Sequence, residues 1–397
     1  MRVSAPDDER LLDPGKNGPG GRASSPRLAG FGRSALNLAR GRLPAYTRNW
    51  RHLQLLSRYA TSAKLANIVR AELARMRGDI SLRSKPYIYT VDVGNICNLR
   101  CPLCPTGVQG LGRPQGFMSV DDFEAVLEQI KPWAIEVVLH NWGEPFLHPR
   151  FLDLVRASRA AGVGTATSTN LNLVRRGSDF LREVVDSGLD HLVVSIDGTT
   201  PEVYESYRRG GNLEHVLTNL KDLIAHKRAV RSKTPVIEWQ FLMMKHNQHQ
   251  ADDARRLAAE LGVDQLRFLG AGLPFEDLAD VDLGEKWLPE DPEYRGYDPA
   301  IIRDRGYLYD EGCFYLYRAM TVNPSGEVAP CCAVHHSKWD FGNLLESGLE
   351  QVWNNPLYQS SRALFSSKGH AGGEETVCHV CPLFKYESSG KGQCAGS

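Results

Sequence analysis

Three cysteines in one short segment are the first residues that could carry chemistry. Cys97, Cys101 and Cys104 are separated by three and two residues, so one tight loop can aim their sulfurs at one point. Three thiolates would ligate a 4Fe-4S cluster and leave its fourth iron open to another ligand. Zinc usually takes four ligands, or three and a water, and this spacing is not typical of zinc sites. The segment therefore favours an iron-sulfur cluster.

Four further cysteines form a second pattern near the C-terminus. Cys313 and Cys331 make one separated pair, and Cys378 and Cys381 make another. Four thiolates from these pairs would fully ligate one additional 4Fe-4S cluster. A zinc site with four cysteine ligands is the alternative that the spacings alone allow. Because the same chain contains the first cysteine triplet, we favour an iron-sulfur cluster over zinc at this second site.

Two of the nine cysteines are left over, namely Cys332 and Cys394. Cys332 adjoins a predicted cluster ligand, where its thiol could donate a hydrogen atom. Buried free cysteine more commonly behaves as a small apolar residue, and we expect both thiols to be inert. His335 and His336 are likewise expected to be packing or surface residues rather than ligands.

These residues must be positioned by the elements that begin at Tyr87. Strands are expected at Tyr87–Val93, Glu136–Asn141, Val163–Thr169, His191–Ile196, Val236–Met243 and Asp264–Leu269. Helices are expected between them at Val120–Ile130, Phe151–Ala161, Asp179–Ser187, Leu213–Ala229 and Ala251–Leu261. This alternation predicts an α/β fold with a parallel sheet covered by helices. Six units are too few for a closed eight-stranded barrel, so we expect a partial (β/α)6 TIM-like barrel with its chemistry at the carboxyl ends of the strands.

Local signals mark the ends of several of these helices. Ser119 and Asp122 have the capping-box spacing at the start of one helix. Gly162, Gly188 and Gly262 each follow a helix where a left-handed residue belongs. The chain after the sixth strand has less periodicity, and we expect a loop-rich unit that a metal centre cross-links.

The zero net charge hides two unlike regions. Residues 1–85 hold 17 Lys and Arg against 6 Asp and Glu, a net +11, and the remaining residues hold 30 against 41, a net −11. Residues 1–33 are rich in Gly, Pro, Ser and Arg and are predicted to be disordered, while 34–85 form an amphipathic basic helical extension. This extension could dock on an anionic surface, either a polyanion or an acidic membrane. We favour the alternative that it packs on the acidic body.

Composition also narrows the compartment. No run of eighteen apolar residues is present, which excludes a transmembrane protein. The odd number of cysteines does not suit a disulfide framework, and the acidic cluster at residues 7–9 does not suit a secretory signal. We expect a cytoplasmic protein.

The first triplet, on a loop after the first strand of such a barrel, resembles the radical S-adenosylmethionine (radical SAM) family. After the second strand, residues 141–145 read Asn-Trp-Gly-Glu-Pro and are similar to the GGEP segment of that family, with Trp142 in place of the first glycine. The residue before the third cysteine, usually aromatic in the family, is Leu103, which could still cover an adenine. The later cysteines resemble the family's SPASM or twitch extension, and we expect one auxiliary cluster. The resemblance implies domains at 86–270 and 271–397.

The resemblance also implies residues that would bind SAM. Gly143 and Glu144 would receive the methionyl ammonium, because a carboxylate is the natural acceptor for it. Ser195 and Asp197 at the end of the fourth strand could bind the ribose or the carboxylate of SAM. Further candidates, on the third and fifth strands, are Asn170 and Gln240.

The chemistry implied is hydrogen abstraction by a 5'-deoxyadenosyl radical, with electrons from a flavodoxin or ferredoxin system. We expect a small polar substrate, a sugar or aminocyclitol, and dehydrogenation or epimerisation, which would make an oxidoreductase or an epimerase. A peptide-modifying maturase is the alternative enzyme. A third reading is an iron-sulfur electron-transfer protein without catalysis, although such a carrier would not need Gly143 and Glu144 as ammonium acceptors.

Overall fold

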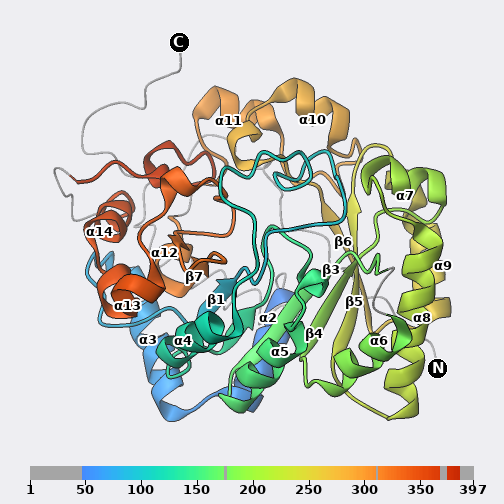
Figure 1. The fold of residues 1–397 in the computed structure, drawn as a ribbon. Coiled ribbons are helices and arrows are strands. Elements are labelled where there is room, and N and C mark those ends of the chain that lie inside the picture. The colour runs from blue at the N-terminus through green and yellow to red at the C-terminus, as the bar shows by residue number, and fades with distance from the viewer. Residues whose placement is uncertain (1–46, 174–176, 310–311, 367–372, 385–397) are drawn as a thin grey trace, which may run out of the picture.

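One eight-stranded sheet organises the computed structural model, which describes residues 47–173, 177–309, 312–366 and 373–384. The strand order is β6-β5-β4-β3-β2-β1-β7-β8 (Figure 1). The strands are β1 (Ile88–Val91), β2 (Glu136–Val138), β3 (Gly164–Thr169), β4 (His191–Ser195), β5 (Val236–Met243), β6 (Gln265–Gly270), β7 (Ala319–Val322) and β8 (Val328–Ala329). All neighbours pair in parallel except β7 and β8, which are antiparallel. The six-stranded parallel barrel segment predicted from the sequence is confirmed.

The helices that follow these strands lie where the sequence pattern predicts them. They are α4 (Val120–Ile130), α5 (Phe151–Ala160), α6 (Gly177–Asp186), α8 (Leu213–Ala229) and α9 (Ala251–Leu261). The Ser119 hydroxyl caps α4 by accepting from the Asp122 amide at 3.0 Å, and Gly262 ends α9 with a left-handed φ of 73°. An additional short helix, α7 (Pro201–Tyr207), follows β4.

The two faces of the sheet differ in polarity. On β5, Trp239 and Phe241 belong to the large core between the sheet and its helices. The intervening residues Glu238 and Gln240 point to the other face, where both contact Arg267 of β6. At β5 the inner face of the barrel therefore carries polar side chains, while the large apolar core lies on the outer face.

Two N-terminal helices, α2 (Thr47–Tyr59) and α3 (Ser62–Arg77), pack on this body. Arg51 Nε lies 2.8 Å from a carboxylate oxygen of Glu136 at the start of β2, and Arg58 Nη1 lies 2.6 Å from Asp190, just before β4. Leu55 is buried and lies so close to Gly164 that a Cβ there would be 2.6 Å from it. Helix α2 thus covers the amino ends of the central strands, on the side opposite the cysteine loop.

The region after residue 270 contains more regular structure than we expected. Its helices are α10 (Val281–Trp287), α11 (Pro299–Arg305), α12 (Tyr315–Arg318), α13 (Leu344–Trp353) and α14 (Pro356–Ala363). Five 3-10 turns also occur in the described chain, η1 (Pro145–Leu147), η2 (Gln248–Gln250), η3 (Phe275–Asp277), η4 (Ser337–Trp339) and η5 (Val377–Val380). Because β7 pairs with β1 over four residues, this region extends the barrel sheet rather than forming a separate layer.

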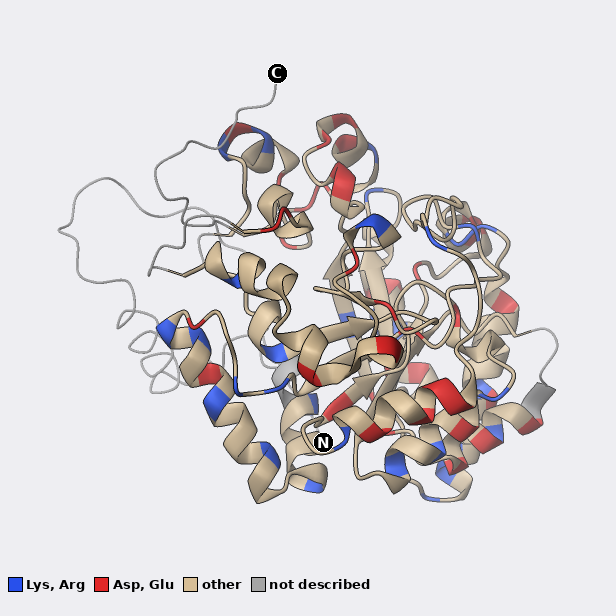
Figure 2. Cartoon of the chain, turned by 60° about the vertical axis from the view of Figure 1, so that its left-hand side comes forward, with Lys and Arg blue, Asp and Glu red and all other residues tan. Residues whose placement is uncertain are grey.

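Charge is distributed unevenly over the molecule. Figure 2 shows acidic residues gathered on helices at the lower right and basic residues along the helix at the lower left. None of the helices in the described ranges is both long enough and apolar enough to cross a bilayer.

Candidate functional site

The first three cysteines lie on one loop that follows β1. The Leu99 amide donates to Cys97 Sγ at 3.4 Å, and a turn brings the Cys104 amide to 3.1 Å from the carbonyl of Cys101. The pKa of the Cys97 thiol is raised to about 12, mainly by burial and to a smaller extent by the nearby thiols of Cys101 and Cys104. A thiolate here needs a cationic partner, and bound iron would supply one.

The donor set fits a cluster of several irons. The thiols of Cys101 and Cys104 lie near enough to that of Cys97 to affect its pKa, and the Leu99 amide and the Asn170 side-chain amide reach the sulfur of Cys97. Across the described ranges, no three His, Cys, Asp or Glu side chains are placed to hold a single metal ion. Three thiols on one loop are nevertheless the kind of donor set that a 4Fe-4S cluster with one open iron would take.

Gly143 fixes how closely the β1 and β2 loops approach. A Cβ on Gly143 would lie 1.8 Å from the carbonyl oxygen of Gly94, so only glycine fits. The next residue, Glu144, donates its amide to the Ile96 carbonyl at 2.9 Å. Residues beside Cys97 are thus held directly against the segment predicted to bind the ammonium.

The Glu144 carboxylate already has three donors within the protein. One oxygen accepts from the Thr169 hydroxyl at 2.7 Å and from the Phe146 amide at 3.0 Å, and the other accepts from the Asn170 amide at 2.7 Å. Burial raises the pKa of Glu144 to about 7, against the effect of these donors. Glu144 therefore positions the end of β3, and its role as an ammonium acceptor stays a prediction.

A row of asparagines joins the end of β3 to the cysteine loop. Asn170 Nδ2 lies 3.7 Å from Cys97 Sγ and 2.9 Å from Asn98 Oδ1. Asn98 in turn donates to the Asn172 carbonyl at 2.9 Å, and Asn172 donates to the Tyr204 hydroxyl at 2.8 Å. Sequence reasoning found Asn170 but missed Asn98 and Asn172, although Asn98 stands directly between the cysteines.

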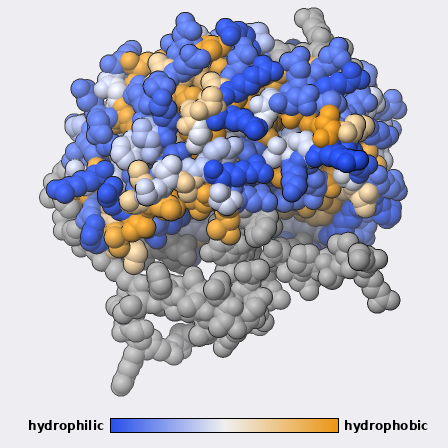
Figure 3. Space-filling view, turned by 90° about the horizontal axis from the view of Figure 1, so that it is seen from below, coloured by the Kyte–Doolittle hydropathy of each residue, from blue (hydrophilic) through white to orange (hydrophobic). Residues whose placement is uncertain are grey.

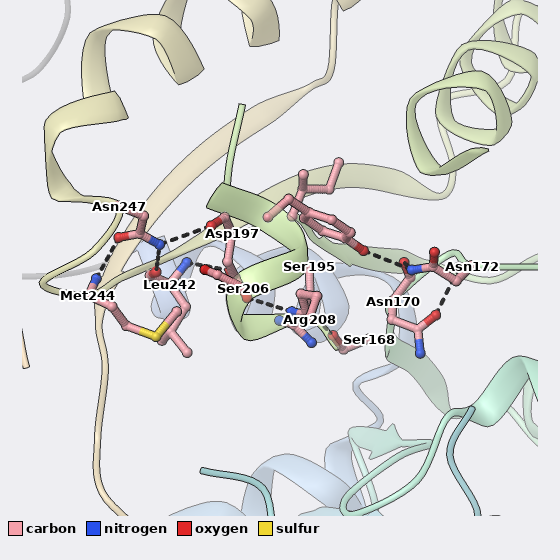
Figure 4. A network of polar contacts seen from close by, with 12 residues as sticks. Ser168, Asn170, Asn172, Ser195, Asp197, Ser206, Arg208, Leu242, Met244 and Asn247 are labelled. Atoms are coloured by element: carbon pink, nitrogen blue, oxygen red, sulfur yellow. Dashed lines mark hydrogen bonds and ion pairs between the residues drawn. The ribbon is translucent and has the colours of Figure 1, made fainter. Parts of the chain in front are cut away.

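Arg208 is the functional residue that sequence reasoning missed most clearly. Its Nε lies 2.5 Å from Asp197 Oδ2 (Figure 4), and it hydrogen-bonds the sulfur of Cys101. Burial raises the pKa of the Cys101 thiol, and this guanidinium opposes the rise. The predicted ligand Asp197 is also held by the Leu242 amide at 2.7 Å, so it orients a cation beside the cysteine loop.

The other predicted SAM contacts lie on the polar inner face. Ser195 Oγ is 3.2 Å from Ser168 Oγ (Figure 4), at the carboxyl ends of β4 and β3. The Gln240 oxygen accepts from Arg267 at 2.6 Å, so that acceptor is occupied. The structure brings Ser195 and Asp197 together at one end of the barrel, and Gln240 lies on the neighbouring strand.

The two positions that depart from the expected motif both have a packing role. The Trp142 ring meets the His335 ring edge to face, with centroids 5.6 Å apart. His335 is buried, with its Nδ1 3.2 Å from the Leu111 carbonyl oxygen and its Nε2 2.9 Å from a carboxylate oxygen of Glu276, both of which are acceptors. Leu103 is 8% exposed and packs in a small core with Leu99. Trp142 thus ties the β2 loop to the C-terminal region.

The second set of cysteines surrounds a small cavity. Cys313, Cys331, Cys378 and Cys381 all line a hollow of about 80 Å³ whose other walls are mainly aromatic and aliphatic. Burial raises the pKa of the Cys313 thiol to about 12, and that of the other three thiols is raised by burial as well. Backbone amides of Leu316 and Tyr315 face the Cys313 sulfur. One buried and three half-buried cysteines, with no cation among the lining residues, are a donor set that a metal cluster would fit.

Cys332 lines the same cavity, with its sulfur 3.9 Å from the Tyr315 hydroxyl. Its role stays a prediction, and Cys394 lies outside the described residues.

Two stretches of the chain match known family profiles. Residues 91–237 match the profile of the radical SAM superfamily. Residues 313–382 match SPASM, described as an iron-sulfur cluster-binding domain. The first stretch contains the cysteine loop and the Glu144 network, and the second contains the four-cysteine cavity.

Several curated relatives are similar over most of their length. The tungsten-containing aldehyde ferredoxin oxidoreductase cofactor-modifying protein of Pyrococcus furiosus is 24% identical over 74% of this chain and 87% of its own. Mycofactocin maturase MftC of Mycobacterium ulcerans is 26% identical over 70% of this chain and 77% of its own. PqqA peptide cyclase of Bradyrhizobium diazoefficiens is 24% identical over 80% of this chain and 84% of its own.

The fold is also found among solved structures. Streptococcus suis SuiB bound to precursor peptide SuiA has a TM-score of 0.56 and 15% identity, covering 86% of this chain and 81% of that one.

These relatives overturn the expected substrate class. They are named for peptide cyclisation, maturation and cofactor modification, and not for sugar or aminocyclitol chemistry. The expectation of a sugar or aminocyclitol substrate is therefore wrong, and these relatives do not single out an oxidoreductase or an epimerase. It failed because a single auxiliary site does not by itself select a substrate class.

Proposed function

The chain belongs to the radical SAM superfamily and carries a C-terminal SPASM iron-sulfur domain, and from that premise we propose that it is a peptide-modifying maturase. The observation that carries the proposal is similarity to a peptide cyclase and a maturase over 80% and 70% of this chain. We keep 86–270 and 271–397 as its proposed domains. The basic helical extension at 34–85 is proposed as a third unit.

The cofactors of this enzyme are SAM and iron-sulfur clusters, and together they supply hydrogen-atom abstraction from a substrate carbon. Cys97, Cys101 and Cys104 would hold the cluster that binds SAM. The auxiliary cluster would be held by the other four cysteines, Cys313, Cys331, Cys378 and Cys381. We assign Gly143 and Ser195 to SAM binding, and Glu144 and Asp197 to positioning the residues around it.

An open barrel suits a peptide better than a closed one. The described sheet runs from β6 to β8 without closing, and β6 pairs only with β5. Gln265 and Leu269 on this edge strand are exposed. An extended peptide can enter such a side opening and add main-chain hydrogen bonds along the free edge.

We propose that the electron donor, a flavodoxin or ferredoxin, docks beside the cysteine loop. A hollow of about 720 Å³ there is lined by Arg100, Arg209 and the backbone around Gly107. Both arginines are exposed. Acidic one-electron carriers would be attracted to such a basic rim.

The proposal is tested by substrate class. The anaerobically reconstituted, reduced protein is incubated with SAM and either a panel of synthetic peptides or a panel of glycosides. We expect peptides to increase 5'-deoxyadenosine formation and to change in mass. Stimulation by glycosides alone, or turnover with no change in any peptide, would refute peptide modification.

A further inference from the structure

The N-terminal helix α3 is built the opposite way from an ordinary surface helix. Its inward face carries the polar residues Lys64 and Asn67, which are 4% and 1% exposed. Lys64 Nζ donates to the Gly162 carbonyl at 2.7 Å, and the Asn67 amide exchanges two 2.9 Å hydrogen bonds with the backbone of Lys85. The small residues Ala71 and Ala74 of the same face are buried as well. Helix α3 is therefore anchored on the body by polar contacts and small apolar side chains, and not by its large exposed ones.

The outward face of α3 carries the large apolar residues. These are Leu65, Val69, Leu73 and Met76, each between 45% and 57% exposed, and we call them the α3 stripe. Their spacing of four, four and three residues places them on one side of the helix, over about 16 Å. Leu53 on α2 is 52% exposed as well. Monomeric soluble proteins rarely expose such contiguous apolar surface without a binding role.

The sequence in and before α3 is basic. Arg70 is exposed between Val69 and Leu73 and makes no ion pair within the described ranges. The chain between Pro14 and the start of α2 contains six Lys and Arg and no acid. Figure 3 shows hydrophobic side chains among hydrophilic ones on the underside of the molecule. Apolar and basic groups are thus presented together.

We propose that the α3 stripe docks this enzyme on the surface of an anionic lipid bilayer. Stable binding at such a surface takes an apolar face that enters the headgroup region together with nearby basic residues. A nucleic acid would use the arginines but gain nothing from four exposed aliphatic side chains. A second copy would bring two sets of basic residues together. This inference does not depend on the substrate class proposed above.

Docking of this kind leaves the catalytic end free. Helix α2 covers the amino ends of the strands, where Glu136 and Asp190 lie, and α3 follows on the same side (Figure 1). The cysteine loop is at the other end of the barrel. The site would thus face the solvent when α3 contacts the lipid.

The test is sedimentation of the full cluster-loaded chain with vesicles of phosphatidylcholine, alone or mixed with phosphatidylglycerol. We expect the protein to bind the anionic vesicles. Its binding to the neutral vesicles should be at least about tenfold weaker. The double variant V69D/L73D should lose at least about tenfold of that binding, and Arg70→Glu should weaken it without removing apolar surface. Val230→Asp, at a residue 48% exposed on the end of α8, is the matched control and should bind as wild type.

Several results would overturn the proposal. They are no binding of the wild type to anionic vesicles, undiminished binding by V69D/L73D, and an equal loss in the Val230→Asp control. Tight binding of duplex DNA that V69D/L73D retains would assign the basic region to nucleic acid. A dimer in ultracentrifugation that V69D/L73D dissociates would assign the stripe to a second copy. Unchanged iron content and circular dichroism verify that each variant is folded.

Discussion

The two thiol sites of this protein differ in their surroundings more than in their ligands. Around the triplet, Asn170 and Arg208 reach the sulfurs of Cys97 and Cys101, and the polar inner face of the barrel adjoins it. Around the four-cysteine cavity the walls are mainly apolar and include no charged side chain. Three ligands in a polar setting leave one iron for a cofactor, whereas four ligands in an apolar setting complete the coordination. With the proposed ligands, the triplet would therefore be the site that reacts, and the four-cysteine cavity would be fully coordinated.

The largest effect should come from the triplet itself. Replacing Cys97, Cys101 and Cys104 by Ala should abolish 5'-deoxyadenosine formation, because the cluster proposed to bind SAM would be lost. Iron should fall from roughly eight to about four per chain, since the cavity keeps its own four thiols. Iron analysis and product assay check both. Unchanged iron content would show that the triplet holds no cluster.

The next effect concerns the network behind the triplet. Glu144→Gln replaces one carboxylate oxygen by a donor that faces the Asn170 amide or the Thr169 hydroxyl. We expect the Kd for SAM to rise about 10- to 100-fold, as when other second-layer groups are removed. Glu276→Gln, at the His335 contact, serves as the control and should leave the Kd unchanged. Unaltered SAM binding by Glu144→Gln would contradict the positioning role.

Arg208 offers a way to change one site electrostatically and not the other. Arg208→Gln removes the cation beside Cys101 and leaves the buried Asp197 without its partner. The reduced cluster carries one more negative charge, so its midpoint potential should become more negative, by on the order of tens of millivolts. Spectroelectrochemical titration should show no shift at the auxiliary site. A shift at both sites would mean general loosening of the fold.

The smallest effect is expected at Cys332. Although it lines the auxiliary cavity, the four other cysteines there would already complete the proposed cluster. Cys332→Ser should therefore keep the wild-type iron content and the same auxiliary spectrum, while Cys331→Ser next to it should lose iron. Loss of iron in Cys332→Ser would make it a ligand.

Much of the fold could be predicted because its signals are local. The Ser119 cap, the left-handed Gly262 and the apolar runs of the strands each act within a few residues, and the helices at 120–130, 213–229 and 251–261 have the predicted bounds. The pairing of β7 with β1 could not be predicted. It joins residues more than two hundred positions apart, and short strands carry no signal of their partner.

The candidate site divides in the same way. Both sets of cysteines could be identified from the sequence, because their residue type and spacing are distinctive. Arg208 could not be identified in this way. An arginine at the end of a short helix has the sequence pattern of a surface residue, and only the fold shows that it pairs with Asp197, which follows β4. The occupied state of the Glu144 and Gln240 acceptors also depends on neighbours from other strands.

The ion pairs of α2 have a consequence for the order in which the protein can assemble. Arg58 pairs with Asp190, which is 132 residues later in the chain, and Arg51 pairs with the fully buried Glu136. Helix α2 is the first described element to be synthesised, yet its site exists only when β2, β3 and β4 are aligned. Such non-local contacts slow folding. During synthesis, therefore, the first described helix can pack in its final place only after the middle of the barrel has formed.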